Sequence, residues 1–379
     1  MPTAHDIAVL GATPAGYVAA LTLAGRGHSA AVVDCPASPT ESPLADWMPA
    51  ELLKTCPALK AVAAAGADGP FRAVQFHSSD LAREAVFRQR THAGLFLRRA
   101  RLIRAFEARA RKAGVRIVRS RRPVRPELDE GFVTLDTKPR LRAGLLLVAQ
   151  GGPAEAIAGL GLATRAAPPV RMTVWGIDVP SRGRPTDDAL HVIAFEEFDR
   201  LGMFFRAGDV LHVRIVSTRR AHPAPRGREA SDGAVGANAL GDLIARLQQA
   251  ELLPGKLNLG KSTAAAWAPP GGAALEMESH LAKRTLLIGT AGGFASAMSG
   301  QTIDPSVRSA LVAAEVAGEA LASDGVQEAL ADYKKRWREP LADRIRPPGT
   351  TLRMLMPMVL SNKAMTARFA TALLRGEGL

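Results

Sequence analysis

The sequence of 379 residues predicts an α/β protein in which one doubly wound, parallel-sheet domain is interrupted by an antiparallel sheet and followed by a helical tail. Three patterns predict this arrangement. A strand, a glycine-rich turn and a helix follow one another at the N-terminus, the same succession returns near residue 290, and short alternating strands lie between them. We therefore expect a split domain at 1–169 and 262–330, an inserted sheet at 170–261 and a helical segment at 331–379.

The N-terminal pattern is typical of a dinucleotide-binding unit. Residues 6–10 are an apolar run of the kind found in buried parallel strands, and the turn GATPAG follows at 11–16. A helical pattern then leads to a second strand, which ends on Asp34. Strand, glycine turn, helix, strand and acid is the order of a dinucleotide-binding βαβ unit, and the alternative is a βαβ turn of the same shape that binds nothing.

Each position of this turn has a chemical reason. Gly11 permits the tight turn, Gly16 lets the helix pack on the sheet, and the helix N-terminus offers N–H groups to a pyrophosphate. Asp34 is placed to accept hydrogen bonds from an adenosine ribose. Thr13 replaces the usual second glycine, which narrows the approach of a phosphate, although its hydroxyl could donate to one. The cofactor-binding residues expected in the turn are Gly11, Thr13, Pro14, Ala15 and Gly16.

A second glycine-rich turn lies near the other end of the chain. The strand at 284–288 runs into it, and a helix is expected from about residue 305 to 321, with Asp304 as N-cap and Pro305 at its first position. An NAD enzyme does not need such a second element, whereas FAD is long enough for its flavin end to require a separate cradle. The residues expected beside the flavin are Gly289, Thr290, Gly292, Gly293 and Phe294.

Four local motifs resemble the FAD-dependent family that includes geranylgeranyl reductases, flavin-dependent halogenases and p-hydroxybenzoate-hydroxylase-type monooxygenases. They are GATPAG with Asp34, the strand-to-helix stretch FLRR at 96–99, the strand GLLLVAQG at 144–151, and IGTAGGF followed by SGQTI. The resemblance implies a split Rossmann-type FAD-binding domain, an inserted antiparallel-sheet substrate domain that closes over the flavin, and a cofactor contact from Arg99.

Three positions depart from the family pattern. Thr13 replaces a glycine, Gln150 replaces the aspartate of an Asp-Gly pair, and Thr290 replaces the aspartate that binds the ribityl chain. Lycopene cyclases, relatives that use flavin without net redox change, carry a similar Gly-Thr-Ala stretch. The alternatives are FAD held mainly by backbone groups, FAD bound weakly, or FAD lost.

The leading hypothesis is an FAD-dependent oxidoreductase, a reductase or monooxygenase, for an apolar isoprenoid or aromatic substrate, with NAD(P)H as candidate electron donor. The alternatives are a flavin-free or weakly flavin-binding descendant that binds a lipid, an isoprenoid or a partner protein without catalysis, and a redox-neutral flavoprotein like lycopene cyclases. No catalytic residue is identified, because Glu196 and Glu197 are adjacent and the histidines lack metal-ligand spacing. Five residues either line an apolar cavity or pack in the core: Trp175, Met203, Phe204, Phe205 and Trp267.

Composition bears on partners and location. The net charge is +13, but 39 of the 49 basic residues are arginine, they are scattered, and aromatic residues make up only 5%, so we expect no nucleic-acid partner. Two cysteines favour a reducing cytoplasm, and no apolar run reaches about 18 residues. Residues 352–374 are expected either to pack as a helical hairpin on the FAD domain or to contact a membrane surface peripherally.

Overall fold

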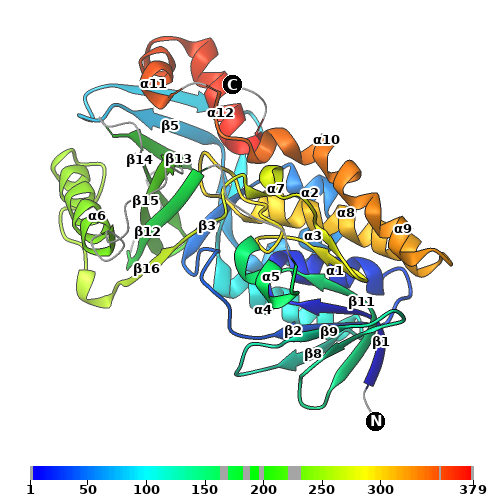
Figure 1. Cartoon of the computed structure of the whole chain (residues 1–379). Helices are drawn as coiled ribbons and strands as arrows, with labels where there is room; N and C mark the ends of the chain where they lie inside the picture. The colour runs from blue at the N-terminus through cyan, green and yellow to red at the C-terminus, as the bar shows by residue number, and fades with distance from the viewer. Residues whose placement is uncertain are drawn as a thin grey trace.

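The computed structural model of this chain describes residues 3–162, 170–181, 188–195, 200–220, 232–349 and 351–376. It contains a parallel-strand sheet, two separate sheets of largely antiparallel strands and a set of C-terminal helices, which confirms the predicted fold class (Figure 1).

The first sheet forms the split domain. Its strands are ordered β17-β18-β11-β1-β2-β8, and β11, β1, β2, β8 and β18 run parallel. The central strands are apolar on both faces, as expected where both faces of a parallel sheet are covered. The bounds are β1 Thr3–Leu10, β2 Ala30–Asp34, β8 Arg116–Arg119, β9 Pro126–Leu128, β10 Val133–Leu135, β11 Leu141–Val148, β17 Leu281–Ala282 and β18 Thr285–Leu287.

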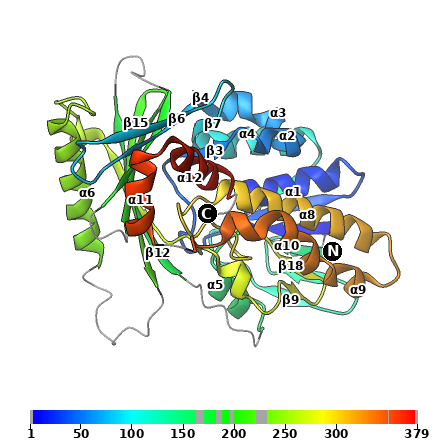
Figure 2. The ribbon, with the colours of Figure 1, turned by 90° about the horizontal axis from the view of Figure 1, so that it is seen from above.

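Helices α1 (Pro14–Ala24), α4 (Arg99–Lys112) and α8 (Ile303–Leu321) cover one face of this sheet. Alanines on α1 and α8 are fully buried, so the two helices approach closely, and Figure 2 shows them side by side. The other face packs on side chains from β9, β10 and α5 (Pro153–Gly159). The flanking helices are α2 Leu52–Thr55, α3 Pro57–Gly66, α7 Ala273–Glu276, α9 Val326–Ala331 and α10 Tyr333–Ile345.

Helix α8 corrects one expectation. Its N-cap is Thr302 and not Asp304, because the Asp304 carboxylate is engaged by Arg308 one turn further along the helix. The side chain of Gln301 takes over the capping role, since its Oε1 accepts the Asp304 N–H at 3.1 Å.

The second sheet has seven strands in the order β16-β12-β15-β14-β13-β5-β6. Its edge strand β16 pairs with β12. Residues 263–267, which the sequence predicted to belong to the split domain, therefore belong to this sheet instead. On the opposite side β5 pairs in parallel with β13, a contact between residues more than one hundred positions apart. The bounds are β5 Ala73–His77, β6 Glu84–Arg88, β12 Val170–Pro180, β13 Ala189–Ala194, β14 Arg200–Ala207, β15 Val210–Arg220 and β16 Thr263–Trp267.

The two faces of the second sheet are covered differently. Helix α6 (Asp232–Gln249) and the short 3₁₀ helix Leu259–Lys261 lie on the outer side, and Figure 2 shows α6 at one end of the molecule. The inner face packs against the third sheet, ordered β3-β7-β4. The third sheet comprises β3 Ala45–Pro49, β4 Ala67–Phe71 and β7 Gly94–Arg98.

The C-terminal tail is a helical hairpin of α11 (Leu352–Ser361) and α12 (Lys363–Arg375). It packs on β5, β6 and β3 rather than on the parallel-sheet domain, because Leu355, Val359 and Phe369 join the core of the second sheet. Across the described part of the chain, no helix combines the length and apolarity that a membrane crossing requires.

Candidate functional site

The first glycine turn has the backbone that the sequence predicts. Gly11 has a φ of 125°, and its N–H donates to the carbonyl oxygen of Val33 at 2.8 Å. A Cβ on Gly16 would lie 2.1 Å from the carbonyl oxygen of Gly11, so only glycine permits this approach. The hydroxyl of Thr13 caps α1 by accepting the Gly16 N–H at 3.1 Å, and it donates to the carbonyl oxygen of Ala149 at 3.4 Å. Thr13 is therefore engaged within the protein.

Asp34 stands at the carboxyl end of β2. Among the described residues, no hydrogen bond or ion pair engages its carboxylate. Burial raises the pKa of this carboxyl, with Glu107 adding to the effect and Arg119 opposing it. An unengaged, half-buried acceptor at this place suits the hydroxyls of a ribose.

The second glycine turn meets the first. Gly289 has a φ of 56°, and a Cβ there would lie 3.0 Å from the Ala15 side chain and 3.0 Å from the carbonyl oxygen of Ala149. The Gly289 N–H donates to Ser309 Oγ of α8 at 2.9 Å. Two motifs separated by most of the sequence thus come together at the carboxyl edge of the parallel sheet, where open α/β sheets bind ligands.

An aromatic cluster holds the second turn from behind. Phe294 is fully buried against Trp337, with ring centroids 5.0 Å apart, and near Tyr333 and His280. Its side chain lies in the core. It does not extend toward the place between the turns where the sequence predicted it to lie beside a flavin. Burial lowers the pKa of His280 to about 4, so at neutral pH its ring is uncharged and Nε2 donates to the carbonyl oxygen of Gly292 at 3.0 Å.

Residues 36–44, here termed the crossing segment, lead from β2 to β3 over the edge where the turns meet. The Ser38 N–H donates to Glu155 Oε2 at 3.2 Å, which fixes the segment to the helix after β11. The carbonyl oxygen of Pro39 accepts the Ala268 N–H at 3.0 Å, just beyond β16. The segment thus bridges the parallel sheet and the second sheet.

Thr40 is the residue of the crossing segment that reaches the second turn. Its Oγ1 donates to the carbonyl oxygen of Gly151 at 3.3 Å and shares a hydrogen bond of 3.0 Å with Thr290 Oγ1. Thr290 is fully buried and Thr40 is 8% exposed. The hydroxyl that was expected to contact a cofactor is therefore satisfied by the chain itself.

Glu41, the next residue, forms an ion pair with Arg99 at the start of α4. The side chains are only 9% and 12% exposed, respectively. Burial lowers the pKa of Arg99 to about 10, which leaves the guanidinium charged at neutral pH. Its Nη1 is buried without a hydrogen-bond partner. The arginine expected to contact a cofactor thus faces an internal carboxylate that satisfies only part of it.

Gln150 fills a further part of the same edge. Its Nε2 donates to the carbonyl oxygen of Cys35, at the start of the connection from β2 to the crossing segment. A Cβ on Gly11 would lie 2.6 Å from the Gln150 Cβ, so the side chain stands directly over the first turn. The amide that replaces the family aspartate ties the ends of β11 and β2 together.

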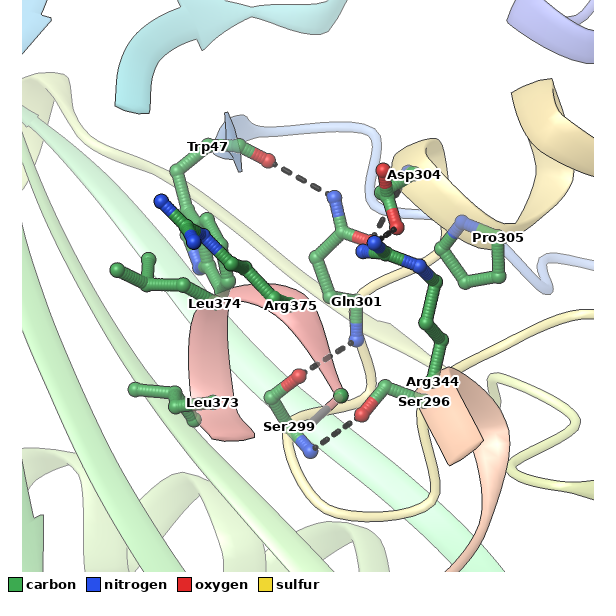
Figure 3. Close-up of a pocket in the computed structure, with 11 residues that line it drawn as sticks. Trp47, Ser296, Ser299, Gln301, Asp304, Pro305, Arg344, Leu373, Leu374 and Arg375 are labelled. Atoms are coloured by element: carbon green, nitrogen blue, oxygen red, sulfur yellow. Dashed lines mark hydrogen bonds and ion pairs between the residues drawn. The ribbon is translucent and has the colours of Figure 1, made fainter. Parts of the chain in front are cut away.

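A cleft of about 230 Å³ lies beside this edge, at the start of α8 (Figure 3). Gln301 bridges it, since its Nε2 donates to the carbonyl oxygen of Trp47 at 3.0 Å. Only about 10 Å³ of this space admits a water molecule and the rest includes open solvent, so the cleft is far smaller than the roughly 300–1,000 Å³ typical of ligand pockets. Its other lining residues are Ser296, Ser299, Asp304, Pro305, Arg344, Leu373, Leu374, Arg375 and Gly376.

A cluster of buried ion pairs closes one side of the cleft. Asp304 contacts Arg308 at 2.8 Å and Arg344 at 3.3 Å, and Glu51 contacts the same arginines at 2.9 and 2.8 Å and Arg375 at 3.3 Å. Burial raises the pKa of Asp304, although both arginines oppose the shift. Sequence reasoning missed this cluster; the spacing of Asp304 and Arg308 on one helix was its only local signal.

The apolar residues that the sequence assigns either to one cavity or to the core do not share a surface. Met203, Phe205 and Trp267 belong to the core between the second and third sheets, whereas Phe204 packs on the opposite face with α6. Successive residues of a strand point to opposite faces, so Phe204 and Phe205 cannot face the same space. Glu196 and Glu197 lie outside the described residues, and the described part holds no cluster of His, Cys, Asp or Glu suited to a metal.

The residues present fit FAD unequally. The adenosine-diphosphate (ADP) half has the glycine turn, the N-terminus of α1 and the unengaged Asp34 carboxylate. At the flavin half the side chains are engaged within the chain, because Thr40 contacts Thr290 and Glu41 contacts Arg99. Arg99 Nη1 remains an unsatisfied donor there, and Thr302 Oγ1 at the start of α8 is also buried without a partner.

Comparison with known proteins bears on the fold. No family model matches the chain, and no curated protein matches its sequence. A geranylgeranyl bacteriochlorophyll reductase-like protein from Thermoplasma acidophilum aligns with a TM-score of 0.72 at 16% identity, covering 100% of this chain and 98% of that one. The chain has the fold of the FAD-dependent oxidoreductases.

Further solved structures support the same conclusion. A flavoprotein/dehydrogenase from Cytophaga hutchinsonii aligns with a TM-score of 0.68 at 15% identity, over 98% of this chain and 93% of that one. The p-nitrophenol 4-monooxygenase of Pseudomonas putida gives 0.67 at 15% identity, over 98% and 94%. These likenesses cover the whole architecture, including the second sheet, so the resemblance inferred from four short motifs is confirmed at the level of the fold.

Proposed function

We propose that this protein is an FAD-dependent oxidoreductase for an apolar small molecule. The observation that carries the proposal is the meeting of the two glycine turns at the carboxyl edge of the parallel sheet, next to an Asp34 carboxylate that no other described residue engages. This is the place where open α/β sheets receive dinucleotides. The ADP half of FAD would lie against Gly11, Ala15 and Asp34.

When bound, FAD supplies the redox chemistry, and the protein binds, orients and shields it. Pro14 has no N–H and Thr13 takes that of Gly16, which leaves Ala15 as the first-turn donor to a phosphate. The Gly289–Gly293 turn is held rigid by α8 and by the cluster around His280. NADPH or NADH is the proposed electron donor.

The apolar character of the substrate is proposed from the surroundings. The core between the second and third sheets is built from large apolar side chains, and the C-terminal hairpin packs on the same core. Met354 and Met358 of α11 remain 65% and 42% exposed, which is compatible with a peripheral contact to lipid.

Calorimetric titration of the purified protein with ADP and with FAD tests the proposal. We expect saturable binding of both, weakened at least tenfold by Asp34→Ala, because a hydrogen bond to a charged acceptor contributes about 1.5–3 kcal/mol. Asp324→Ala removes an exposed carboxylate just beyond the C-terminal end of α8 and serves as the control, with no change expected. Bleaching of added FAD by NADPH would then identify the electron donor.

The second candidate is a flavin-free protein of this fold. The specific observation in its favour is the crossing segment, whose Thr40 and Glu41 satisfy Thr290 and Arg99 without any ligand. If the protein binds neither ADP nor FAD in the titration, the FAD-dependent oxidoreductase proposal is excluded and the flavin-free candidate is retained.

A further inference from the structure

The crossing segment lies at the one place on the parallel sheet where its topology opens a crevice. From β1 the chain proceeds to β2 on one side, while β11 pairs on the other, so the strand order changes direction between β1 and β11. Ligands of open α/β sheets bind in the crevice outside such a point. Gly11 marks one wall of this crevice, and Gly151 and Gly289 mark the other.

The segment bridges both walls with polar groups of the kind a ligand would offer. A hydroxyl, that of Thr40, reaches Gly151 and Thr290, and an anion, that of Glu41, reaches the buried guanidinium of Arg99. A phosphorylated polyol carries the same two groups. Glu41 leaves Arg99 Nη1 without a partner, so the internal carboxylate satisfies the arginine less completely than a group with more oxygens could.

The segment is built so that it can leave. Residues 36–39 are exposed, three prolines stand at 36, 39 and 43, and the segment contains no helix or strand. Before Leu44 in the sequence, the segment is held by the side chains of Thr40 and Glu41 and by the backbone contacts of Ser38 and Pro39. Segments held by few buried apolar contacts open at low free-energy cost.

We propose that the crossing segment is an internal competitor for the flavin half of the cofactor: Thr40 and Glu41 occupy the places of its hydroxyls and its anionic group until FAD displaces them. This inference rests on the proposed function, because it assigns the closed half of the same groove. It accounts for one structure in which the Asp34 carboxylate at the ADP end has no partner among the described residues, while the side chains at the flavin end already have partners within the chain.

The competition has a measurable consequence. ADP binds without moving the segment, whereas FAD must displace it, so in the wild-type protein the flavin half adds little to affinity. Thr40→Ala removes two hydrogen bonds of the closed form without burying a charge, and we expect it to tighten FAD about tenfold and leave ADP unchanged. Glu41→Gln removes the anion but keeps an acceptor for Arg99, and the same selective gain is expected.

Ser38→Ala is the matched control, since it lies in the same segment and its contact to Glu155 uses the backbone N–H. Thermal unfolding of each variant verifies that it is folded, and calorimetric titration with ADP and FAD supplies both affinities. A gain for FAD alone in Thr40→Ala and Glu41→Gln supports the proposal. Equal FAD affinity in all four proteins overturns the competitor and leaves the proposed function standing, whereas absence of ADP and FAD binding from all four overturns both.

Discussion

The two ends of the groove differ in what they are made of. At the ADP end the features are backbone ones: the φ of Gly11, the close approach of Gly16 to Gly11 and the N-terminus of α1. The flavin end has a glycine turn of its own, but two side chains, Thr290 and Arg99, also belong to it, and both have partners in the crossing segment. At the first end the Asp34 carboxylate has no partner among the described residues, whereas at the second end the side chains are engaged by the crossing segment.

This difference teaches how a binding site can change while its fold stays. A glycine turn is required by packing as well as by a ligand, because Gly16 and Gly289 contact backbone and the Ala15 side chain directly. A side chain that only contacts a ligand is not required for packing in this way. A hydroxyl or a carboxylate from a neighbouring loop can therefore replace the ligand as its partner.

The Glu41–Arg99 pair should be the most sensitive point. Glu41→Leu leaves a buried guanidinium unpaired and should lower the free energy of unfolding by about 3–5 kcal/mol, while Glu41→Leu with Arg99→Leu should recover most of the loss. Denaturant unfolding measures both. The control is Glu319→Leu in an exposed pair with Arg336, which should cost less than about 1 kcal/mol. A loss of similar size in the double variant would contradict a buried, internally satisfied pair.

The contribution of His280, which packs behind the second glycine turn, to the free energy of unfolding should depend on pH. His280 has a pKa of about 4 in the folded protein, lowered by burial from an ordinary 6.5. Between these values the unfolded chain binds more protons, so the free energy of unfolding should fall as the pH drops from about 6.5 to 4, by up to about 3 kcal/mol. His280→Gln should flatten the profile, and the exposed His92→Gln should not. An unchanged slope in His280→Gln would remove His280 from this account.

The backbone character of the ADP end can be tested at Gly16. Gly16→Ala places a Cβ 2.1 Å from the Gly11 carbonyl oxygen and should destabilise the fold by about 1–3 kcal/mol while abolishing ADP binding. Gly241→Ala, in α6 with no atom within 4 Å of the added Cβ, should instead stabilise by about 0.5–1 kcal/mol. Chemical unfolding and ADP titration decide the matter. A stable Gly16→Ala variant that still binds ADP would sink the interpretation.

The smallest effect concerns Thr13. Because its hydroxyl caps α1, Thr13→Ala should cost about 1 kcal/mol of stability, and Thr13→Ser should retain most of it. If Thr13 acted chiefly on a phosphate, Thr13→Ala would lower ADP affinity without a change in thermal unfolding. The two measurements together separate a cap from a ligand contact.

The sequence predicted the parts whose signals are local. The strand from residue 6, the turn at Gly11, the helix behind it and Asp34 at the next strand end all follow from short-range periodicity and glycine spacing, and each is present. The second glycine turn followed for the same reason. The N-cap prediction for Asp304 was wrong because ion pairs with Arg308 and Arg344 engage its carboxylate.

The closed flavin end could not be predicted, because its contacts join residues far apart. Thr40 and Thr290 are separated by 250 positions, and Glu41 and Arg99 by 58. Likewise, the pairing of β5 with β13 and the packing of the C-terminal hairpin on β5 and β6 depend on tertiary contacts with no local pattern. The mistaken grouping of Phe204 with Phe205 is different, since strand alternation alone separates them.

Hydrogen exchange in the crossing segment shows directly whether FAD displaces this segment and ADP does not. In the free protein the amides of Ser38 and Ala45 are hydrogen-bonded to Glu155 and Asp178. Saturation with FAD should speed exchange at Ser38 and its neighbours, because the segment has to leave the groove, whereas saturation with ADP should not. Exchange that stays equally slow with FAD bound would contradict the account.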